Sequence, residues 1–283
     1  MKNDLMLIGE IADFFGISRK AIRLYEKKGI IRPVKVDPVN GYRYYSAEQV
    51  QQLNALLELK TLGFSLDEIS KVLCRLGYEV FGIGRNFDKD KELTAESFHP
   101  ILCNLLDTEK LCETIKEISS DHHMTMLVNN AGTAYYGLHE ELNPKKIQQM
   151  VRTNLEVPMI LTCLLLRELK KSKGYVINIS SVTAGSSNPH GCAYGATKAG
   201  LSSFSRSLFD EARKYGVKVV TISPDMTQTN LYRNANFKES DDIQSYLMPQ
   251  EVAKAVEFVL SQRDGLVISD ITLKPQIHRI GRK

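Results

Sequence analysis

The 27-residue stretch from Gly174 to Gly200 constrains the fold of this chain most, because it combines a strand, a loop and the start of a helix. Tyr175–Ile179 is a β-type run that leads to Ser181, and a helical pattern begins at Tyr194. Lys198 follows four residues later, so a helix places the phenol and the ammonium on one face. A nearby ammonium favours the phenolate, and a serine hydroxyl can hold a carbonyl or alcohol. The pattern predicts a proton-transfer site, which needs a second group that supplies a hydride. For the Tyr and Lys alone, the alternative is two surface residues that are four positions apart by chance.

Two segments upstream supply the rest of such a site. The apolar run Met124–Gly132 ends in Asn-Asn-Ala-Gly, and Asn154 follows within a helical pattern. Together with the Ser and the Tyr-x-x-x-Lys spacing, these motifs resemble the short-chain dehydrogenase/reductase family from about Leu76 to the C-terminus. The resemblance implies four catalytic residues: Tyr194 as general acid/base, Lys198 lowering its pKa and contacting the ribose, Ser181 orienting the carbonyl, and Asn154 holding a water in the proton relay.

The resemblance also implies a nicotinamide cofactor. Arg85 directly follows the family's second strand, and a guanidinium there favours NADP because it can pair with the 2′-phosphate. Two positions depart from the family pattern: Asn104 replaces an Asp near the adenine, and Asp225 replaces the Gly after Pro224. The expected cofactor-binding residues are Arg85, Asn129, Ala131, Gly132, Tyr194, Lys198 and Thr229.

The alternation of strand and helix patterns predicts an α/β fold with a Rossmann-like, doubly wound parallel sheet. Such a fold holds the pyrophosphate on backbone amides of a Gly-rich turn between the first strand and the first helix. That strand and turn are absent from this sequence. Gly82 and Gly84 end the second strand and lack a third glycine before a helix. We therefore expect a truncated sheet in which each neighbour of the missing strand has an open edge.

The N-terminal region has a different pattern. Ile8–Phe15 reads as a short helix, and a turn with Ser18 as N-cap leads to a second helix over Arg19–Lys28. Two extended runs follow, joined by a turn that contains Asn40 and Gly41, a strong hairpin signal. Residues 18–43 include eight Lys or Arg and two Asp or Glu residues. Binding to the phosphate backbone of a nucleic acid requires such an excess of positive charge. The pattern predicts a winged helix-turn-helix, although a solvated charged face would also explain the charge.

Residues Leu7–Leu73 closely resemble the DNA-binding domain of the MerR family of transcriptional regulators. Ala21 stands where that family often has Thr, and Leu24 where it often has an aromatic residue. The resemblance implies a DNA-binding domain over residues 1–75, with helices over Ala47–Leu62 and from Ser65 to about Leu76, fused to a reductase-like domain over residues 76–283. The expected DNA-binding residues are Ser18, Arg19, Lys20, Arg23, Tyr25, Lys35, Tyr42, Arg43 and Tyr44.

Composition excludes other classes. With 43% hydrophobic and 25% charged residues, the chain is neither disordered nor fibrous. The five cysteines lack zinc-knuckle or redox spacing, so we expect reduced thiols and no metal. No secretory signal pattern is present and the longest apolar run is too short to span a bilayer, which predicts a cytoplasmic protein without a membrane partner.

Three functions remain open. The complete DNA-binding half favours a MerR-type regulator whose reductase-derived half acts as a sensor or assembly domain, with double-stranded DNA, a second copy and a small-molecule effector as partners. The alternative is an NADP-dependent reductase of a carbonyl or alcohol substrate, with a DNA-binding appendage and the four-residue site above. The third is a fusion whose reductase-like half is inert, because without a bound nicotinamide no hydride accompanies the Tyr194 proton.

Overall fold

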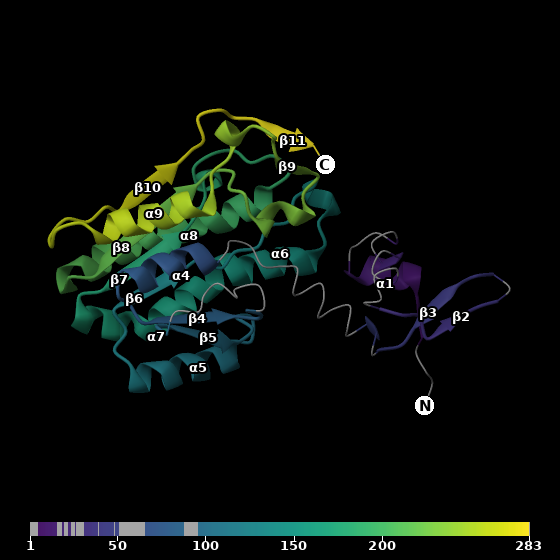
Figure 1. Ribbon diagram of the computed structural model, residues 1–283, viewed down its shortest axis with the longest axis horizontal. Coiled ribbons are helices and arrows are strands. Elements are labelled where there is room, and N and C mark those ends of the chain that lie inside the picture. Colours follow the sequence, from purple (N-terminus) through teal and green to yellow (C-terminus); the bar gives the residue numbers. More distant parts are fainter. Residues whose placement is uncertain are drawn as a thin grey trace. The chain divides into compact units, whose positions relative to one another are not determined.

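The computed structural model divides the chain into two compact units. The first unit is Met1–Thr61 and the second is Leu62–Lys283 (Figure 1). The expected DNA-binding residues Ser18, Lys20 and Tyr25 lie outside the described residues, as does most of the helix expected over Ala47–Leu62. The residues that the structure describes are 5–15, 19, 22–23, 26, 31–38, 40–47, 49–50, 66–87 and 96–282.

The first unit contains a small antiparallel sheet beside a helix. Its strands are β1 (Met6–Leu7), β2 (Lys35–Val36) and β3 (Arg43–Tyr45), in the order β1-β3-β2, and α1 (Ile8–Phe15) follows β1. The turn between β2 and β3 includes Gly41 at a φ of 70°, a conformation that glycine adopts without strain. This hairpin agrees with the Asn-Gly signal of the sequence. Its small core consists of Ile11, Ala12, Ile22, Ile31 and Tyr45.

The second unit is built on parallel strands that form two separate pieces. One piece pairs β4 (Val80–Gly84) with β5 (Phe98–Leu102), and the other has the order β10-β8-β7-β6. The strands of the larger piece are β6 (Met126–Asn129), β7 (Tyr175–Ile179), β8 (Lys218–Pro224) and β10 (Asp270–Leu273). The main helices are α4 (Leu66–Arg75), α5 (Thr108–Asp121), α6 (Pro144–Val151), α7 (Val157–Ser172), α8 (Cys192–Ala212) and α9 (Pro249–Leu260). The expected α/β fold with a Rossmann-like parallel sheet is confirmed.

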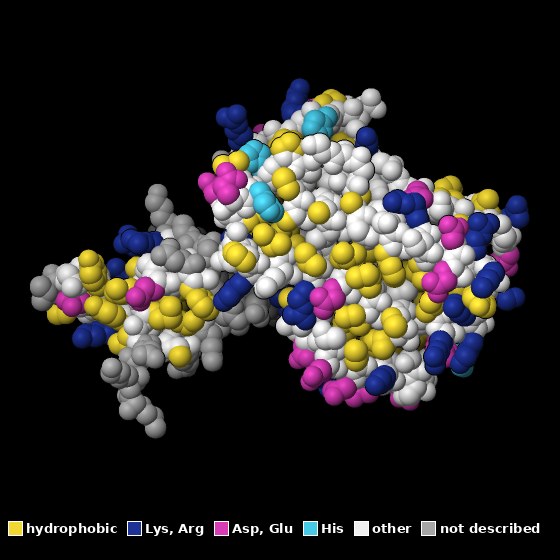
Figure 2. Space-filling view, turned by 180° about the vertical axis from the view of Figure 1, so that it is seen from behind, with side chains coloured by type: hydrophobic (Ala, Val, Ile, Leu, Met, Phe, Trp, Pro, Cys, Tyr) yellow, Lys and Arg dark blue, Asp and Glu magenta, His cyan; other side chains and the backbone are white. Residues whose placement is uncertain are grey.

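Helices cover both faces of the larger sheet. Successive side chains along each strand point to opposite faces, so both faces carry apolar residues that need covering. On β7, Val176 contributes to the core that α5, α7 and α8 cover, whereas Ile177 and Ile179 contribute to the core beneath α4 and α9 (Figure 1). Helix α4 therefore packs within the second unit, although the sequence places it before the boundary expected at residue 75. Figure 2 shows acidic and basic side chains interspersed with hydrophobic ones on one face of this unit.

A cavity of about 640 Å³ separates the two pieces of sheet. Within the described part of the chain, β4 pairs only with β5 and β6 only with β7, so the edges of β4 and β6 that border the cavity lack a strand partner. Apolar side chains from the flanking helices close it, including Ile69 and Leu73 of α4, Ile118 of α5 and Leu161 of α7. The described residues thus show the gap that the sequence predicted for a sheet without its first strand.

The parallel sheet brings the expected site residues to one edge. Arg85 follows β4, Asn129 ends β6, Ser181 comes two residues after β7, and Thr229 lies beyond the end of β8. The carboxyl ends of parallel strands share an edge, and open α/β sheets bind their ligands in the crevice outside it. A short antiparallel pair, β9 (Phe237–Glu239) with β11 (Ile280–Arg282), lies in the segments that follow β8 and β10.

Candidate active site

The loop after β7 and the first turns of α8 hold the proton-transfer residues. Ser181 is the N-cap of the short 3-10 helix Val182–Ala184, and its Oγ accepts hydrogen bonds from Thr183 N at 3.2 Å and Thr183 Oγ1 at 3.0 Å. Helix α8 places Tyr194 and Lys198 one turn apart, with exposed fractions of 2% and 1%. The expected pairing of these two side chains on one helix face is therefore observed, and both are buried rather than on the surface.

Burial dominates the electrostatics of this pair. It raises the pKa of Tyr194 to about 12, against the opposing effect of a hydrogen bond with Ser181. Burial also lowers the pKa of Lys198 to about 8. The Lys198 ammonium lies 6.0 Å from the centre of the Tyr194 ring and donates to the Ile179 carbonyl oxygen at 2.7 Å. The sequence suggested that Lys198 lowers the pKa of Tyr194, but in this structure desolvation is the largest effect on that pKa and raises it, so the phenol is protonated at neutral pH.

Asn154 connects two segments of the site from within a helix irregularity. It lies in a π-helical turn, Arg152–Glu156, between α6 and α7, and it is fully buried. Its Oδ1 accepts from Thr133 N at 2.9 Å, while its Nδ2 donates to Thr133 O at 2.9 Å and to Thr197 Oγ1 at 3.0 Å. Thr197 Oγ1 in turn donates to the Tyr194 carbonyl oxygen at 2.7 Å. The amide thus fixes the loop after β6 against the turn of α8 that carries the tyrosine.

Asn178 of β7 is a buried positioning residue that the sequence reasoning missed. Its Oδ1 accepts from Asn129 Nδ2 at 2.7 Å, and its Nδ2 donates to Ser205 Oγ at 2.8 Å. The chain of hydrogen bonds runs from β6 through β7 to α8 inside the core. A polar residue within an otherwise apolar strand was the available sequence signal.

The expected cofactor residues lie around the carboxyl edge of the sheet. Asn129 and Asn130 are 5% and 6% exposed, border the large cavity, and have Oδ1 atoms without a hydrogen-bond partner among the described residues. Gly132 is buried and Ala131 is exposed, while Thr229 is the N-cap of the 3-10 helix Asn230–Asn234. Acceptors that need donors suit sugar hydroxyls, and the guanidinium of Arg85 suits a phosphate. This donor and acceptor set fits a phosphorylated nucleotide.

Three aromatic rings that the sequence reasoning did not include form a cluster that reaches Tyr194 through Tyr136. The ring centroid of Tyr136 lies 5.9 Å from that of Tyr194, 6.1 Å from Tyr232 and 4.9 Å from Phe237. Tyr232 and Phe237 lie 5.6 Å apart. Burial raises the pKa of both Tyr136 and Tyr232 well above the ordinary value, so these rings form an uncharged apolar wall beside the phenol.

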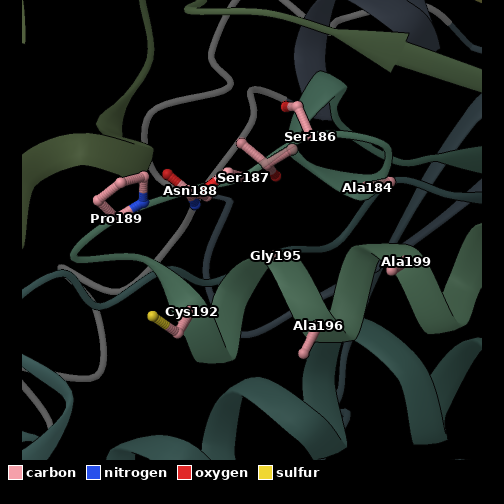
Figure 3. Close-up of a pocket in the computed structure, with 10 residues that line it drawn as sticks. Ala184, Ser186, Ser187, Asn188, Pro189, Cys192, Gly195, Ala196 and Ala199 are labelled. Carbon is pink, nitrogen blue, oxygen red and sulfur yellow. The ribbon is translucent and has the colours of Figure 1, made fainter.

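A small pocket of about 300 Å³ lies nearby but does not contain the proton-transfer residues. Figure 3 shows loop residues 184–189 over the first turns of α8, which contribute Cys192, Ala196 and Ala199. Neither Tyr194 nor Lys198 lines this pocket, because they occupy another face of the helix.

In the first unit, the described basic residues differ in their environment. Arg19, Arg23 and Lys35 are exposed, as is Tyr42. Arg43 instead forms an ion pair with Glu26, at 3.1 Å from Nε to Oε2, and Glu26 also accepts a hydrogen bond from the Tyr45 hydroxyl. Tyr44 is half-buried in β3. Arg43 therefore contributes to the packing of this small unit.

Among the residues described, no helix is long and apolar enough to cross a bilayer. Within the same ranges, no three His, Cys, Asp or Glu side chains gather closely enough to hold a metal ion.

Comparison with known proteins identifies relatives for most of the chain. Residues 62–240 match the short chain dehydrogenase family, and residues 6–76 match the MerR HTH family of regulatory proteins. Serine 3-dehydrogenase of Agrobacterium fabrum is 33% identical over 212 residues, which cover 70% of this chain and 84% of that protein. An uncharacterized oxidoreductase of Staphylococcus epidermidis is 27% identical over 215 residues, 74% of this chain and 91% of the relative.

Solved structures agree on the fold. An alcohol dehydrogenase from the archaeon Thermococcus sibiricus, complexed with 5-hydroxy-NADP, superposes with a TM-score of 0.68 at 22% identity, covering 77% of this chain and 94% of the other. The Escherichia coli serine dehydrogenase superposes with a TM-score of 0.63 at 22% identity, covering 73% and 91%. The family match over residues 62–240, together with the relative that is 33% identical over 70% of the chain, shows that the chain belongs to the short chain dehydrogenase family.

Proposed function

We propose that this protein is an NADP-dependent oxidoreductase that interconverts a carbonyl compound and an alcohol. The observation that carries the proposal is the buried pair of Tyr194 and Lys198, one helical turn apart on α8, with the ammonium 6.0 Å from the centre of the phenol ring. Curated relatives along this part of the chain are oxidoreductases, which favours this function over that of a regulator. The NADP-type ligand of the Thermococcus sibiricus enzyme supports the choice of cofactor.

Each residue has a task in the proposed reduction. The phenol of Tyr194 is protonated at neutral pH, as it would be at its ordinary pKa of 10.0, and burial raises that pKa to about 12, so the phenol has a proton to donate to a carbonyl oxygen. The Ser181 hydroxyl, whose effect on the Tyr194 pKa opposes that of burial, would orient the same oxygen. A bound NADPH would supply the hydride to the carbonyl carbon. In the reverse direction the phenolate takes the proton of an alcohol, and a charged Lys198 stabilises that phenolate.

The rest of the site prepares this arrangement. Asn154 holds the loop after β6 against α8, so the phenol and the cofactor edge keep a fixed separation. The apolar rings of Tyr136, Tyr232 and Phe237 exclude water beside the phenol. The cofactor would be held by Arg85, by Asn129 and Asn130 through their unpartnered Oδ1 atoms, and by the backbone near Gly132 and Thr229.

Steady-state assays with the full chain test this function. NADPH oxidation with a panel of aldehydes and ketones, and NADP⁺ reduction with alcohols, should give turnover. Tyr194→Phe should lower that turnover by a factor of about 100 to 10,000, the usual contribution of general acid–base catalysis. Tyr215→Phe, at an exposed tyrosine after α8, is the matched control and should match wild type. Wild-type turnover no greater than background, or an unaffected Tyr194→Phe variant, would refute the proposal.

A second function is proposed for the first unit, because the match to the MerR family begins at residue 6 and extends through this unit to residue 76. The antiparallel hairpin of β2 and β3 is what a wing would require, and it carries Lys35, Tyr42 and Arg43. We propose that this unit binds duplex DNA through these residues and through Ser18, Arg19, Lys20, Arg23, Tyr25 and Tyr44. Mobility-shift titrations against genomic fragments test it, and equal affinity for every fragment and for random duplex would speak against a regulator.

A further inference from the structure

The cavity between the two pieces of sheet is bordered on one side by the backbone of β4. This strand pairs in parallel with β5, and Val80 N donates to the Ser97 carbonyl oxygen at 2.8 Å. Alternate residues of a parallel strand turn both backbone groups toward the same neighbour. Val80 therefore faces β5, whereas Phe81 and Ile83 turn their N–H and C=O groups toward the cavity, which both residues line.

The backbone of β6 borders the cavity on the other side. The Thr125 carbonyl oxygen accepts from Tyr175 N of β7 at 3.0 Å, so the alternate residues Met126 and Val128 turn away from β7 and toward the cavity. The Val128 carbonyl oxygen accepts from Asn130 N at 3.2 Å, which leaves the two N–H groups and the Met126 carbonyl. Within the described ranges, neither of the two facing edges has a strand partner.

These edges determine the kind of molecule that can fill the cavity. Backbone N–H and C=O groups away from water need hydrogen-bond partners, and leaving them unpaired costs free energy. A small apolar ligand supplies no such partners. An extended peptide supplies donors and acceptors on both of its sides at the spacing of a strand, as in the recognition of peptides by strand addition.

The walls of the cavity determine the side chains of such a peptide. Ile69 and Leu73 of α4 lie on one face of the sheet, and Ile118 of α5 and Leu161 of α7 lie on the other. Successive side chains of an inserted strand would point alternately to these two apolar walls. Strands buried on both faces are near-continuous apolar runs. The occupant is therefore apolar at successive positions, and not only at every second one.

Charge at one end of the cavity favours one direction for the inserted strand. Glu79, directly before β4, is the only Asp or Glu among the described residues that line the cavity, and no Lys or Arg lines it. Its carboxylate lies 2.9 Å from His99 Nε2 and 3.5 Å from His122 Nδ1, and the side chain is 51% exposed. A strand parallel to β4 and β6 begins at this end. A lysine just before its apolar run would meet the Glu79 carboxylate.

We propose that this cavity binds an extended segment of a partner protein as a parallel strand between β4 and β6. The segment is a lysine followed by about five apolar residues, matching the five residues of β4. The inference is independent of the oxidoreductase and DNA-binding functions, because it rests on backbone pairing and requires no cofactor.

Fluorescence anisotropy of the full chain with a labelled peptide tests the strand pairing. The peptide has a lysine, five alternating valines and isoleucines to match β4, and a labelled lysine at its carboxyl end. The control peptide carries N-methyl groups on alternate backbone amides, which removes donors and keeps the apolar side chains. Wild type should bind the first peptide at least about tenfold more tightly, because several hydrogen bonds are lost in the second. The bound peptide should slow hydrogen exchange in β4 and β6 and leave exchange in β10 unchanged.

Two pairs of variants locate the binding. Ile118→Trp places an indole in the cavity and should weaken peptide binding at least about tenfold, the loss of roughly two hydrogen bonds. Phe258→Trp, at a residue of α9 that is 56% exposed and does not line the cavity, is the matched control. Met126→Pro removes an N–H that faces the cavity, at the first position of a strand, where proline is tolerated. It should bind about five- to tenfold more weakly than Met126→Ala, which keeps that N–H.

Each outcome supports or overturns the proposal. Equal affinity for the two peptides indicates an apolar site without strand pairing and overturns it, as does the absence of peptide binding to wild type. Unchanged binding by Ile118→Trp, with a thermal midpoint equal to that of wild type, places the peptide elsewhere and also overturns it. If Ile118→Trp does not fold, the Met126 variants decide, because equal affinity of the Pro and Ala variants excludes pairing with β6. An enzymatically inactive chain that binds the peptide as predicted leaves the inference standing.

Discussion

The Lys198 ammonium donates a hydrogen bond of 2.7 Å to the carbonyl oxygen of Ile179, which ties α8 to the last residue of β7. Both residues are buried, with exposed fractions of 1% and 0%. One backbone carbonyl does not replace the water that an ammonium loses on burial, so the pKa of Lys198 falls to about 8. The lysine therefore changes charge within the pH range in which such a site operates.

This relationship predicts how stability depends on pH. The unfolded chain holds the Lys198 proton up to about its ordinary pKa of 10.5, whereas the folded chain releases it near 8. Between these values the unfolded state binds more protons, so the contribution of Lys198 to the free energy of unfolding increases with pH. Lys198→Met should abolish that increase. Urea unfolding of both proteins at pH 7.5 and pH 10 measures it, and identical pH dependence in the two would contradict the assignment.

Gly174 is the glycine at which a side chain would most directly disturb the sheet. A Cβ there would lie 2.1 Å from the Thr125 carbonyl oxygen, a backbone atom at the start of β6 that accepts from Tyr175 N. Gly174→Ala should lower the free energy of unfolding by about 2 kcal/mol or more, within the range of severe steric strain. At Gly185 a Cβ meets nothing within 4 Å, so Gly185→Ala is the control. Equal stability of the two variants would refute this prediction.

Much of the fold could be predicted from the sequence. The bounds of β7 were predicted as observed, because the strand is a short β-type run followed by a loop of small residues. The Tyr194 and Lys198 pair was predicted because helical periodicity alone brings positions four apart together. The gap between β4 and β6 was predicted because a missing Gly-rich turn implies a missing strand before it.

The remaining features depend on tertiary structure that local patterns do not encode. The strands β9 and β11 are three residues long and lie about 40 positions apart, too short for a period-2 signal. The rings of Tyr136, Tyr232 and Phe237 meet only after the segments following β6 and β8 converge. The sequence predicted a lowered pKa for Tyr194, whereas burial raises it. The sequence did not indicate this direction because the degree of burial is a property of the folded site.

Assembly is a further prediction, based on the apolar surface of the helices that follow β6. Val151 at the end of α6 and Met159 of α7 are 41% and 38% exposed. We propose that these helices associate between two copies of the chain, and we expect a dimer or tetramer. Met159→Glu should shift the sedimentation coefficient toward that of a monomer, because it buries a charge at the interface. Leu138→Glu, at an exposed loop leucine, is the control. A wild-type monomer at micromolar concentration would contradict the prediction.

Two arginines of the first unit should affect DNA binding differently. Arg23 is exposed, so Arg23→Ala should weaken binding to a preferred site by about tenfold and relax its sequence preference, as the loss of a base contact does. Arg43→Ala should weaken binding to all duplexes and flatten its salt dependence. Because Arg43 also pairs with Glu26, circular dichroism must show that the variant remains folded. The same salt dependence in Arg43→Ala as in wild type would exclude a phosphate contact.

The central claim is that Tyr194 protonates a carbonyl while NADPH delivers a hydride, and isotope transfer tests it most directly. NADPH deuterated at the transferable position of the nicotinamide is incubated with the full chain and a carbonyl panel, and the alcohols are analysed by mass spectrometry. The account predicts deuterium at the carbinol carbon with wild type and at least about a hundredfold less with Tyr194→Phe. Alcohol without deuterium, or label equal to that in a reaction without protein, would contradict it.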